Sequence, residues 1–301
     1  MYLLQSKVIY LIKINTILTI AELNRENLME NVFYESLKYS DPSLPLIFHF
    51  DKIMKDDYFL SHWHENIEIL YVIKGNIIVF TDQERVFVSE NELAVINSGN
   101  LHKIITEDEF AEYYCLIADK KMCEEFSINV GEIYFKSVVN DEKAVIIYNK
   151  IVLEFEKKEL YFKTALKAAV IELMVCLTRY HTIKNLPMAE KPSGTKTGIV
   201  KEAIKYIQHN YSKNISTSDI SAALGVSKAY FCRIFKEMTG STAVFYINSL
   251  RCQKAKMLIQ SGNCLASEAA FKSGFENLSY FTKTYKKHIG HMPSKTNLQS
   301  L

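Results

Sequence analysis

Two different spacings of hydrophobic residues divide the first 180 residues. Between residues 45 and 118, short apolar runs alternate with turn residues, and the runs fall at 67–73, 76–80, 85–89 and 93–97. From Val145 to Phe155, and again from Leu166 to Leu177, apolar residues recur every three or four positions. The first spacing predicts strands of an antiparallel barrel or sandwich. The second predicts two amphipathic helices with a break near residues 157–160.

A segment without hydrophobic periodicity separates these elements from the rest of the chain. Residues 184–198 read KNLPMAEKPSGTKTG, and this composition is typical of a linker. Almost everything beyond it is predicted to be helical. We therefore predict an α+β protein with an N-terminal segment at 1–44, a first domain at 45–183, a linker at 184–197 and an all-α domain at 198–301.

The all-α domain contains an internal repeat. Tyr230-Phe231, Phe235-Lys236 and Gly240 recur fifty residues later as Tyr280-Phe281, Tyr285-Lys286 and Gly290. In each copy a short helix leads to a glycine turn, and a second helix follows a capping residue and ends at the last glycine. The caps are Ser216, Ser227 and Asn277, and the turn glycines are Gly225 and Gly274. This plan predicts two helix-turn-helix units.

A long helix predicted at residues 243–260 joins the two units at a fixed separation. Its expected inward positions are Val244, Ile247, Leu250, Ala255 and Leu258. Major grooves on one face of DNA recur about every 34 Å, so two rigidly joined units can each place a helix in a groove. The outward residues of those helices are Lys228, Cys232 and Arg233 in the first unit and Ser279, Thr282 and Lys283 in the second. Their core positions are expected to be Tyr230, Phe231, Ile234, Phe235, Phe281 and Tyr285.

Charge is distributed unevenly between the two domains. The whole chain has a formal net charge of +2. From Thr195 onward there are 15 Lys and Arg against 5 Asp and Glu, whereas the preceding residues hold 21 against 29. The basic second domain favours double-stranded DNA as its partner. Two alternatives are a basic surface that serves solubility and a helical adaptor that binds protein.

Neither the cysteines nor the N-terminus indicates secretion. The six cysteines form no C-x-x-C pair and no zinc-like spacing, which fits a reducing cytoplasm. Lys7, Lys13 and Asn15 interrupt the apolar N-terminus and no cleavage site follows, so we expect a cytoplasmic protein without a membrane partner. More ordinary globular sequence begins at Met29, which gives the hypothesis that residues 1–28 precede the native start.

The runs ISTSDISAALGVSKAYFCRIFKEMTGST and EAAFKSGFENLSYFTKTYKKHIGHMP resemble the DNA-binding domain of AraC/XylS-type transcription regulators. The resemblance covers residues 198–297 and implies sequence-specific DNA binding. The positions that face bases in that family fall on Ala229, Cys232, Arg233, Leu278, Ser279, Thr282 and Lys283. The resemblance also implies an activator, which would contact RNA polymerase, and a homodimer joined through the helices at 142–180.

The first domain contains a histidine-rich constellation. His62, His64 and Glu68 have the spacing of one face of a strand, and His102 from a later strand can join them inside a barrel. Three imidazoles and a carboxylate can hold Fe, Mn, Ni, Cu or Zn. The alternative is a metal-free barrel in which these side chains are hydrogen-bonded core or effector contacts.

The pattern HxH-x3-E-x6-G followed by NSGNLHK resembles the cupin signature, with Asn97 in place of its proline. HWHENIEILYVIKGNI is also similar to the effector domain of AraC-type regulators. These resemblances imply a cupin-like β-barrel, followed by the two amphipathic helices, that binds a small effector such as a sugar through His62, Trp63, His64, Glu68 and His102. On this reading the protein is not an enzyme and has no cofactor. The alternative is a metal-dependent cupin enzyme or metal sensor fused to a DNA-binding tail, with His62, His64, Glu68 and His102 as its ligands.

Overall fold

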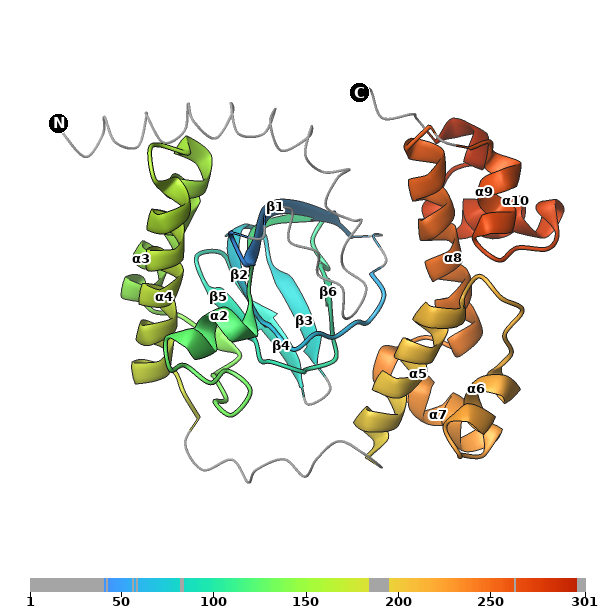
Figure 1. Ribbon diagram of the computed structural model, residues 1–301, viewed down its shortest axis with the longest axis horizontal. Coiled ribbons are helices and arrows are strands. Elements are labelled where there is room, and N and C mark those ends of the chain that lie inside the picture. The colour runs from blue at the N-terminus through green and yellow to red at the C-terminus, as the bar shows by residue number, and fades with distance from the viewer. Residues whose placement is uncertain are drawn as a thin grey trace.

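The computed structural model describes residues 41, 43–55, 57, 59–81, 84–183, 195–262 and 264–296. A β-rich domain with two helices along one side precedes a helical domain (Figure 1). This architecture confirms the predicted fold class. The hypothesis about residues 1–28, most of the predicted N-terminal segment and residues 184–194 of the predicted linker lie outside the described residues.

Two antiparallel sheets form the β-rich domain. The larger has the strand order β1 (Leu46–Met54), β7 (Phe110–Ala118), β2 (Ile67–Lys74), β5 (Leu93–Ile96) and β8 (Val138–Val139). The smaller has the order β4 (Arg85–Val88), β3 (Ile77–Thr81) and β6 (His102–Ile105). Buried side chains from both sheets, among them Leu70, Val72, Val79 and Ile104, form one core. The short strands predicted between residues 45 and 118 are therefore confirmed.

Strand β2 separates two hydrophobic cores because successive side chains on a strand point to opposite faces. Leu70 and Val72 belong to the core between the sheets. Ile67 and Ile69 belong to a second core, which is covered by α3 (Glu142–Lys157) and α4 (Phe162–Tyr180). Both faces of β2 are thus buried. Glu68 shares the face of Leu70 and so points to the interior between the sheets.

In the part of the second domain that the structure describes, the chain forms six helices and a short 3-10 turn. They are α5 (Lys196–Asn210), α6 (Thr217–Ala223), α7 (Lys228–Thr239), α8 (Ala243–Gln260), α9 (Ala266–Lys272), α10 (Leu278–Ile289) and η1 (Pro293–Lys295). Helix α5 begins inside the stretch predicted as linker because Thr195 caps it, with Oγ1 accepting a 3.1 Å hydrogen bond from the Gly198 amide. In Figure 1, α9 and α10 lie toward the other end of α8 from α5, α6 and α7, and α10 also contacts Phe245 and Asn248 in the first half of α8.

The predicted caps and turns of both repeats are present. Ser227 Oγ accepts a hydrogen bond from the Tyr230 amide, and Asn277 Oδ1 accepts one from the Tyr280 amide. The turn at Gly274 has φ +89°, and a Cβ there would lie 2.5 Å from the carbonyl oxygen of Tyr211. Only glycine fits that position, because a side chain meets both the backbone conformation and a neighbouring segment as obstacles.

One core expectation for the helical domain is wrong, because Val244, in the first turn of α8, is 54% exposed. Tyr230 is partly buried and packs against the core of the first unit, and the guanidinium of Arg233 lies 5.4 Å from the centre of its ring. The remaining expected aromatic core residues, Phe231, Phe235, Phe281 and Tyr285, are at most 2% exposed.

Across the described residues, none of the helices combines the length and apolar character needed to cross a bilayer.

Candidate functional site

Four side chains of the histidine-rich constellation meet in the interior of the β-rich domain. One ligand atom from each of His62, His64, Glu68 and His102 can be chosen so that all lie within 4.8 Å of one another. The most exposed of these residues, His62, is only 8% accessible. We call this group the histidine cluster. The expectation that His62, His64 and Glu68 share one strand is wrong, because β2 begins at Ile67 and His62 and His64 lie before it.

Each histidine of the cluster directs Nδ1 to a backbone carbonyl oxygen. The distances are 3.2 Å from His62 to Leu60, 3.1 Å from His64 to Asn66 and 2.9 Å from His102 to Asn100. A carbonyl oxygen only accepts hydrogen bonds, so Nδ1 carries the proton in all three rings. In each neutral ring, Nε2 is then the atom that offers a lone pair.

The lone-pair atoms of two histidines face the same carboxylate oxygen. Nε2 of His64 and Nε2 of His102 lie 3.0 and 3.1 Å from Oε2 of Glu68. A carboxylate oxygen and an imidazole lone pair repel each other at this distance unless a proton or a metal cation lies between them. The cluster therefore requires positive charge at its centre.

The pKa values of Glu68 and His62 follow from this arrangement. Burial alone would raise the pKa of Glu68, but His102 and His64 hold it well below its usual range. Burial, and then the charge that His102 carries when it is protonated, lowers the pKa of His62 to about 3. At neutral pH the cluster thus contains an ionised carboxylate beside at least one neutral imidazole.

The chemistry of these donors fits a divalent transition-metal ion. Metal-bound histidines commonly donate their second ring N–H to a backbone carbonyl, as all three do here. With metal–nitrogen bonds of about 2.0–2.1 Å, the ligand atoms around a tetrahedral ion lie roughly 3–3.5 Å apart. Small shifts of the side chains would close the cluster around such an ion, since its ligand atoms already lie within 4.8 Å.

Sequence reasoning missed further polar residues in the same interior. His49 and Asp51 on β1 are aligned with Cys115 and Tyr113 on β7, and the Cys115 thiol donates a 3.4 Å hydrogen bond to Oε1 of Glu68. Burial, with a contribution from Glu68, raises the pKa of Cys115 well above its usual range, so the thiol stays protonated. The spacing of two residues between 49 and 51, and between 113 and 115, was the available signal.

Trp63 was expected beside the histidines, but the structure places it elsewhere. Its side chain belongs to the same buried hydrophobic cluster as Ile204 and Phe235 of the helical domain. The ammonium groups of Lys201 and Lys205 lie 4.8 and 5.0 Å from the centre of its ring. Because Trp63 stands between two residues that point inward, its own side chain points outward from the β-rich domain.

The two candidate DNA-reading helices expose most of the expected residues. On α7, Lys228, Ala229 and Arg233 are exposed, whereas Cys232 is partly buried. On α10, Leu278, Ser279 and Lys283 are exposed. Thr282 is partly buried, and its hydroxyl donates a 2.9 Å hydrogen bond to the Leu278 carbonyl. Polar and cationic groups are therefore available to a duplex on both helices.

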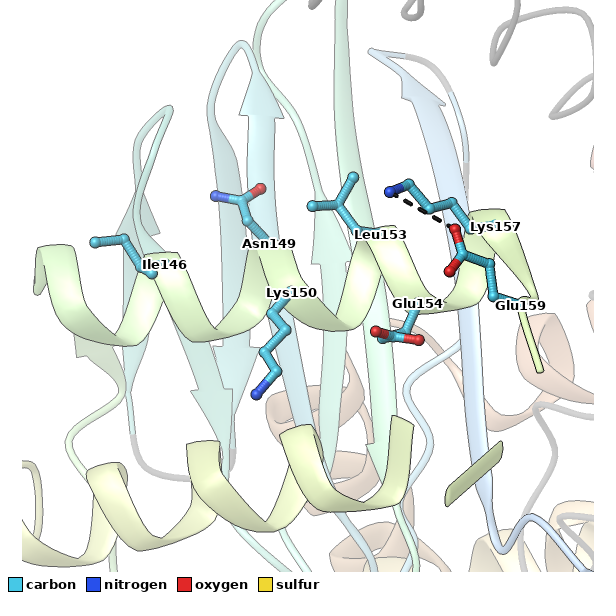
Figure 2. A pocket seen from close by; sticks show the side chains of 7 residues that line it. All are labelled: Ile146, Asn149, Lys150, Leu153, Glu154, Lys157 and Glu159. Carbon is cyan, nitrogen blue, oxygen red and sulfur yellow. Dashed lines mark ion pairs between the residues drawn. The ribbon is translucent and has the colours of Figure 1, made fainter. Parts of the chain in front are cut away.

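The surface of the β-rich domain has a groove along α3. It is lined by Ile146, Asn149, Lys150, Leu153, Glu154, Lys157 and Glu159. Figure 2 shows Ile146, Asn149 and Leu153 on the side of α3 turned away from α4. Ile146 is 62% exposed and Leu153 is 47% exposed, so α3 presents apolar side chains to solvent.

Two family models match the chain. Residues 220–299 match that of a helix-turn-helix domain, and residues 50–117 match that of the cupin domain. The first match spans both candidate DNA-reading helices. The second contains the whole histidine cluster.

Similar proteins include named regulators. The HTH-type transcriptional regulator YdeC of Bacillus subtilis is 24% identical over 252 residues, which are 78% of this chain and 85% of that protein. The Transposon Tn10 TetD protein of Escherichia coli is 31% identical over 98 residues, which are 33% of this chain and 71% of that protein. Among solved structures, ToxT from Vibrio cholerae with a bound unsaturated fatty acid covers 83% of this chain and 94% of its own, with 14% identity and a TM-score of 0.47.

Proposed function

The chain belongs to the AraC-type family of DNA-binding transcription regulators with a cupin effector domain, and we propose that it reads DNA through α7 and α10 and senses a divalent transition-metal ion held in its barrel. The observation that carries the metal proposal is the convergence of His62, His64, Glu68 and His102 within 4.8 Å. No catalytic role is proposed, because the similar proteins are named as regulators.

The geometry of α8 supports DNA reading by a single chain. Helix α8 has 18 residues, so at 1.5 Å per residue it is about 27 Å long. This length approaches the roughly 34 Å between successive major grooves on one face of DNA. In this proposal Lys228, Ala229, Cys232 and Arg233 of α7 meet one groove. Leu278, Ser279, Thr282 and Lys283 of α10 meet the next.

The packing of the barrel favours a metal ion over a sugar as the effector. Apolar side chains such as Val79, Val88 and Ile96 fill the space between the two sheets. A metal ion needs only the space between its own ligands, whereas a sugar would have to displace part of this core. When bound, the ion would supply the positive charge that Glu68 and the histidine lone pairs require. His62, His64, Glu68 and His102 would hold it.

We place a second copy of the chain on the α3 groove. A symmetric dimer uses the same surface twice, so the surface must be complementary to itself. The groove meets this condition, because two lysines and two glutamates flank the apolar Ile146 and Leu153. In an antiparallel α3 pair, each Lys150 or Lys157 can face a glutamate of the partner copy. As a regulator of this kind, the dimer would act in the cytoplasm and, as an activator, contact RNA polymerase.

Metal analysis combined with a DNA-binding assay tests the proposal. Untagged full-length protein is dialysed against Mn²⁺, Fe²⁺, Co²⁺, Ni²⁺, Cu²⁺ and Zn²⁺ separately, and its metal content is measured. We expect about one ion per chain for at least one metal, and loss of that ion in His64→Gln. His209→Gln, which removes an exposed histidine of α5, is the matched control and should retain it.

The same protein is then titrated onto the DNA that flanks its own gene at several salt concentrations. We expect saturable binding that weakens as salt rises, because phosphate contacts release counterions. Substoichiometric metal in every dialysis, or a thermal shift with monosaccharides and none with metals, would overturn the metal proposal. Absence of specific DNA binding at any salt concentration would overturn DNA reading by α7 and α10.

A further inference from the structure

Residues that form the histidine cluster alternate along the chain with residues that contact the helical domain. Ser61 and Trp63 flank His62, and Leu101 and Lys103 flank His102. In extended backbone, successive side chains point to opposite sides. The imidazoles therefore face the barrel interior, and their sequence neighbours face α5, α7 and α8.

These neighbours make specific contacts with the first helix-turn-helix unit. The Tyr246 hydroxyl on α8 donates a 2.9 Å hydrogen bond to the Ser61 carbonyl oxygen, and Ser61 Oγ donates one of 3.2 Å to the Thr239 carbonyl at the end of α7. Trp63 and Leu101 are buried in the same hydrophobic core as Ile204, Phe231 and Phe235. The barrel thus contributes side chains to the core of this unit.

Backbone hydrogen bonds join the two contributing segments. The His62 amide donates a 2.9 Å bond to the His102 carbonyl, and the His102 amide donates a 2.8 Å bond to the His62 carbonyl. The ring centres of His62 and His102 are 4.2 Å apart. Any ligand that draws these two imidazoles together acts on both of the hydrogen-bonded segments at once. The same two segments carry Ser61, Trp63 and Leu101 on the side that faces the helical domain.

The contact is made at one end of α8. The barrel residues share a core with α5, α7 and the first half of α8. At Gly240, which ends α7, a Cβ would lie only 2.8 Å from the Nζ of Lys103. Helices α9 and α10 share a separate core with the second half of α8, and α10 also contacts Phe245 and Asn248 in its first half. Lys228 and Arg233 on α7 remain exposed while the contact is formed. The contact therefore leaves these candidate DNA-reading residues of the first unit uncovered.

We propose that the paired segments at 60–64 and 100–103 couple occupation of the histidine cluster to docking of the first helix-turn-helix unit. The proposal rests on the metal site proposed above. A metal ion that fixes His62 and His102 favours the docked arrangement, in which α7 is held ready for DNA. Metal binding then raises the affinity for operator DNA, and DNA raises the affinity for metal by the same factor.

The single tryptophan of the chain allows the contact to be observed directly. Trp63 lies in the contact, so its fluorescence reports docking. Zn²⁺ is a suitable probe because it has no redox chemistry. Zinc is titrated into metal-free full-length protein, with and without the DNA that flanks its own gene, while zinc content, tryptophan emission and affinity for that DNA are measured. We expect a change in emission that saturates at one zinc per chain and a gain in DNA affinity of about fivefold or more.

A variant that carries both Ser61→Ala and Tyr246→Phe separates metal binding from coupling. It lacks the Tyr246–Ser61 and Ser61–Thr239 hydrogen bonds but keeps every residue of the histidine cluster. We expect it to bind one zinc and to change its DNA affinity by less than about twofold on zinc addition, below the usual range of coupling. Tyr180→Phe, on the exposed end of α4, is the control and should respond as the wild type does.

The possible results distinguish the two proposals. If the wild type binds zinc but either its tryptophan emission or its DNA affinity stays unchanged, the coupling is overturned and the metal site stands. A double variant that responds like the wild type would overturn the coupling as well. If no metal binds to the wild type, the metal site fails and the coupling fails with it.

Discussion

The hydroxyl of Tyr246 donates a 2.9 Å hydrogen bond to the carbonyl oxygen of Ser61, which precedes it by 185 residues. Ser61 stands directly before the first histidine of the cluster, and Tyr246 lies in the first turns of the helix that joins the two helix-turn-helix units. This single bond therefore connects the effector domain with the DNA-reading domain. Because both groups are buried, the bond is shielded from competing water.

Loss of one cationic side chain from either candidate DNA-reading helix, α7 or α10, should weaken binding to the operator, the specific site expected in the DNA that flanks the gene. We expect Arg233→Ala and Lys283→Ala each to cost about 1–3 kcal/mol if the side chain reaches a base. Binding curves on operator and on unrelated DNA at several salt concentrations measure this. Lys121→Ala, an exposed lysine of α2 (Lys120–Glu125) in the barrel domain, should bind like the wild type. A uniform loss on all sequences, with a smaller salt slope, would show that the residue contacts phosphate instead.

The two turn glycines should differ in their tolerance of a side chain. Gly225 has φ +66°, and a Cβ there would meet no atom of a neighbouring segment within 4 Å, so Gly225→Ala meets only backbone strain, at about 1–2 kcal/mol. Gly274→Ala meets both φ +89° and the Tyr211 carbonyl oxygen at 2.5 Å, so we expect at least about 3 kcal/mol. Urea unfolding of both variants provides the comparison. Equal losses for the two would refute the close approach at Gly274.

Stability should depend on the ionisation of Asp141 at acidic pH. Its Oδ2 lies 2.7 Å from Nε2 of His181, and this hydrogen bond, together with the amides at the start of α3, lowers the pKa of Asp141. A carboxyl with a lowered folded-state pKa stabilises the fold above its unfolded-state pKa, near 4, and loses that contribution as the pH falls through the folded value. We therefore expect Asp141→Asn to flatten the decline in urea midpoint between about pH 5 and pH 3. An unchanged decline would contradict this role.

A charge placed in the α3 groove should prevent association of two copies. Leu153 is 47% exposed, so Leu153→Lys should alter folding stability little, by about 0.5 kcal/mol or less. In a symmetric interface it would introduce two buried charges, and we expect a monomer in sedimentation experiments at concentrations where the wild type is dimeric. Leu265→Lys, at an exposed leucine of the helical domain, should leave the dimer intact. A wild type that is monomeric at all concentrations would exclude this interface.

Local sequence patterns were sufficient for strands β2 to β5, for α3, α4 and α8, and for both helix-turn-helix units, but not for β1, β7, β8 or α2. The repeat at 230–240 and 280–290, the caps Ser227 and Asn277 and the glycine turns act within a few residues, so their consequences could be predicted without knowledge of the fold. The spacing of His62, His64 and Glu68 likewise indicated a cluster that His102 could complete. Val244 was misassigned because helical periodicity cannot distinguish a core position from one at the edge of the packed surface.

By itself, the sequence determined that a strand-rich domain with a histidine constellation precedes two helix-turn-helix units, because periodicity, capping and glycine turns are local properties of the chain. Only the tertiary structure decided which side of the segments at 60–64 and 100–103 faces the barrel interior and which side faces the helical domain. It placed Trp63 and Leu101 in the core of the helical domain and Cys115 beside Glu68. The physical reason is that these contacts join residues far apart in the chain, and their partners are chosen by packing rather than by any pattern within one segment.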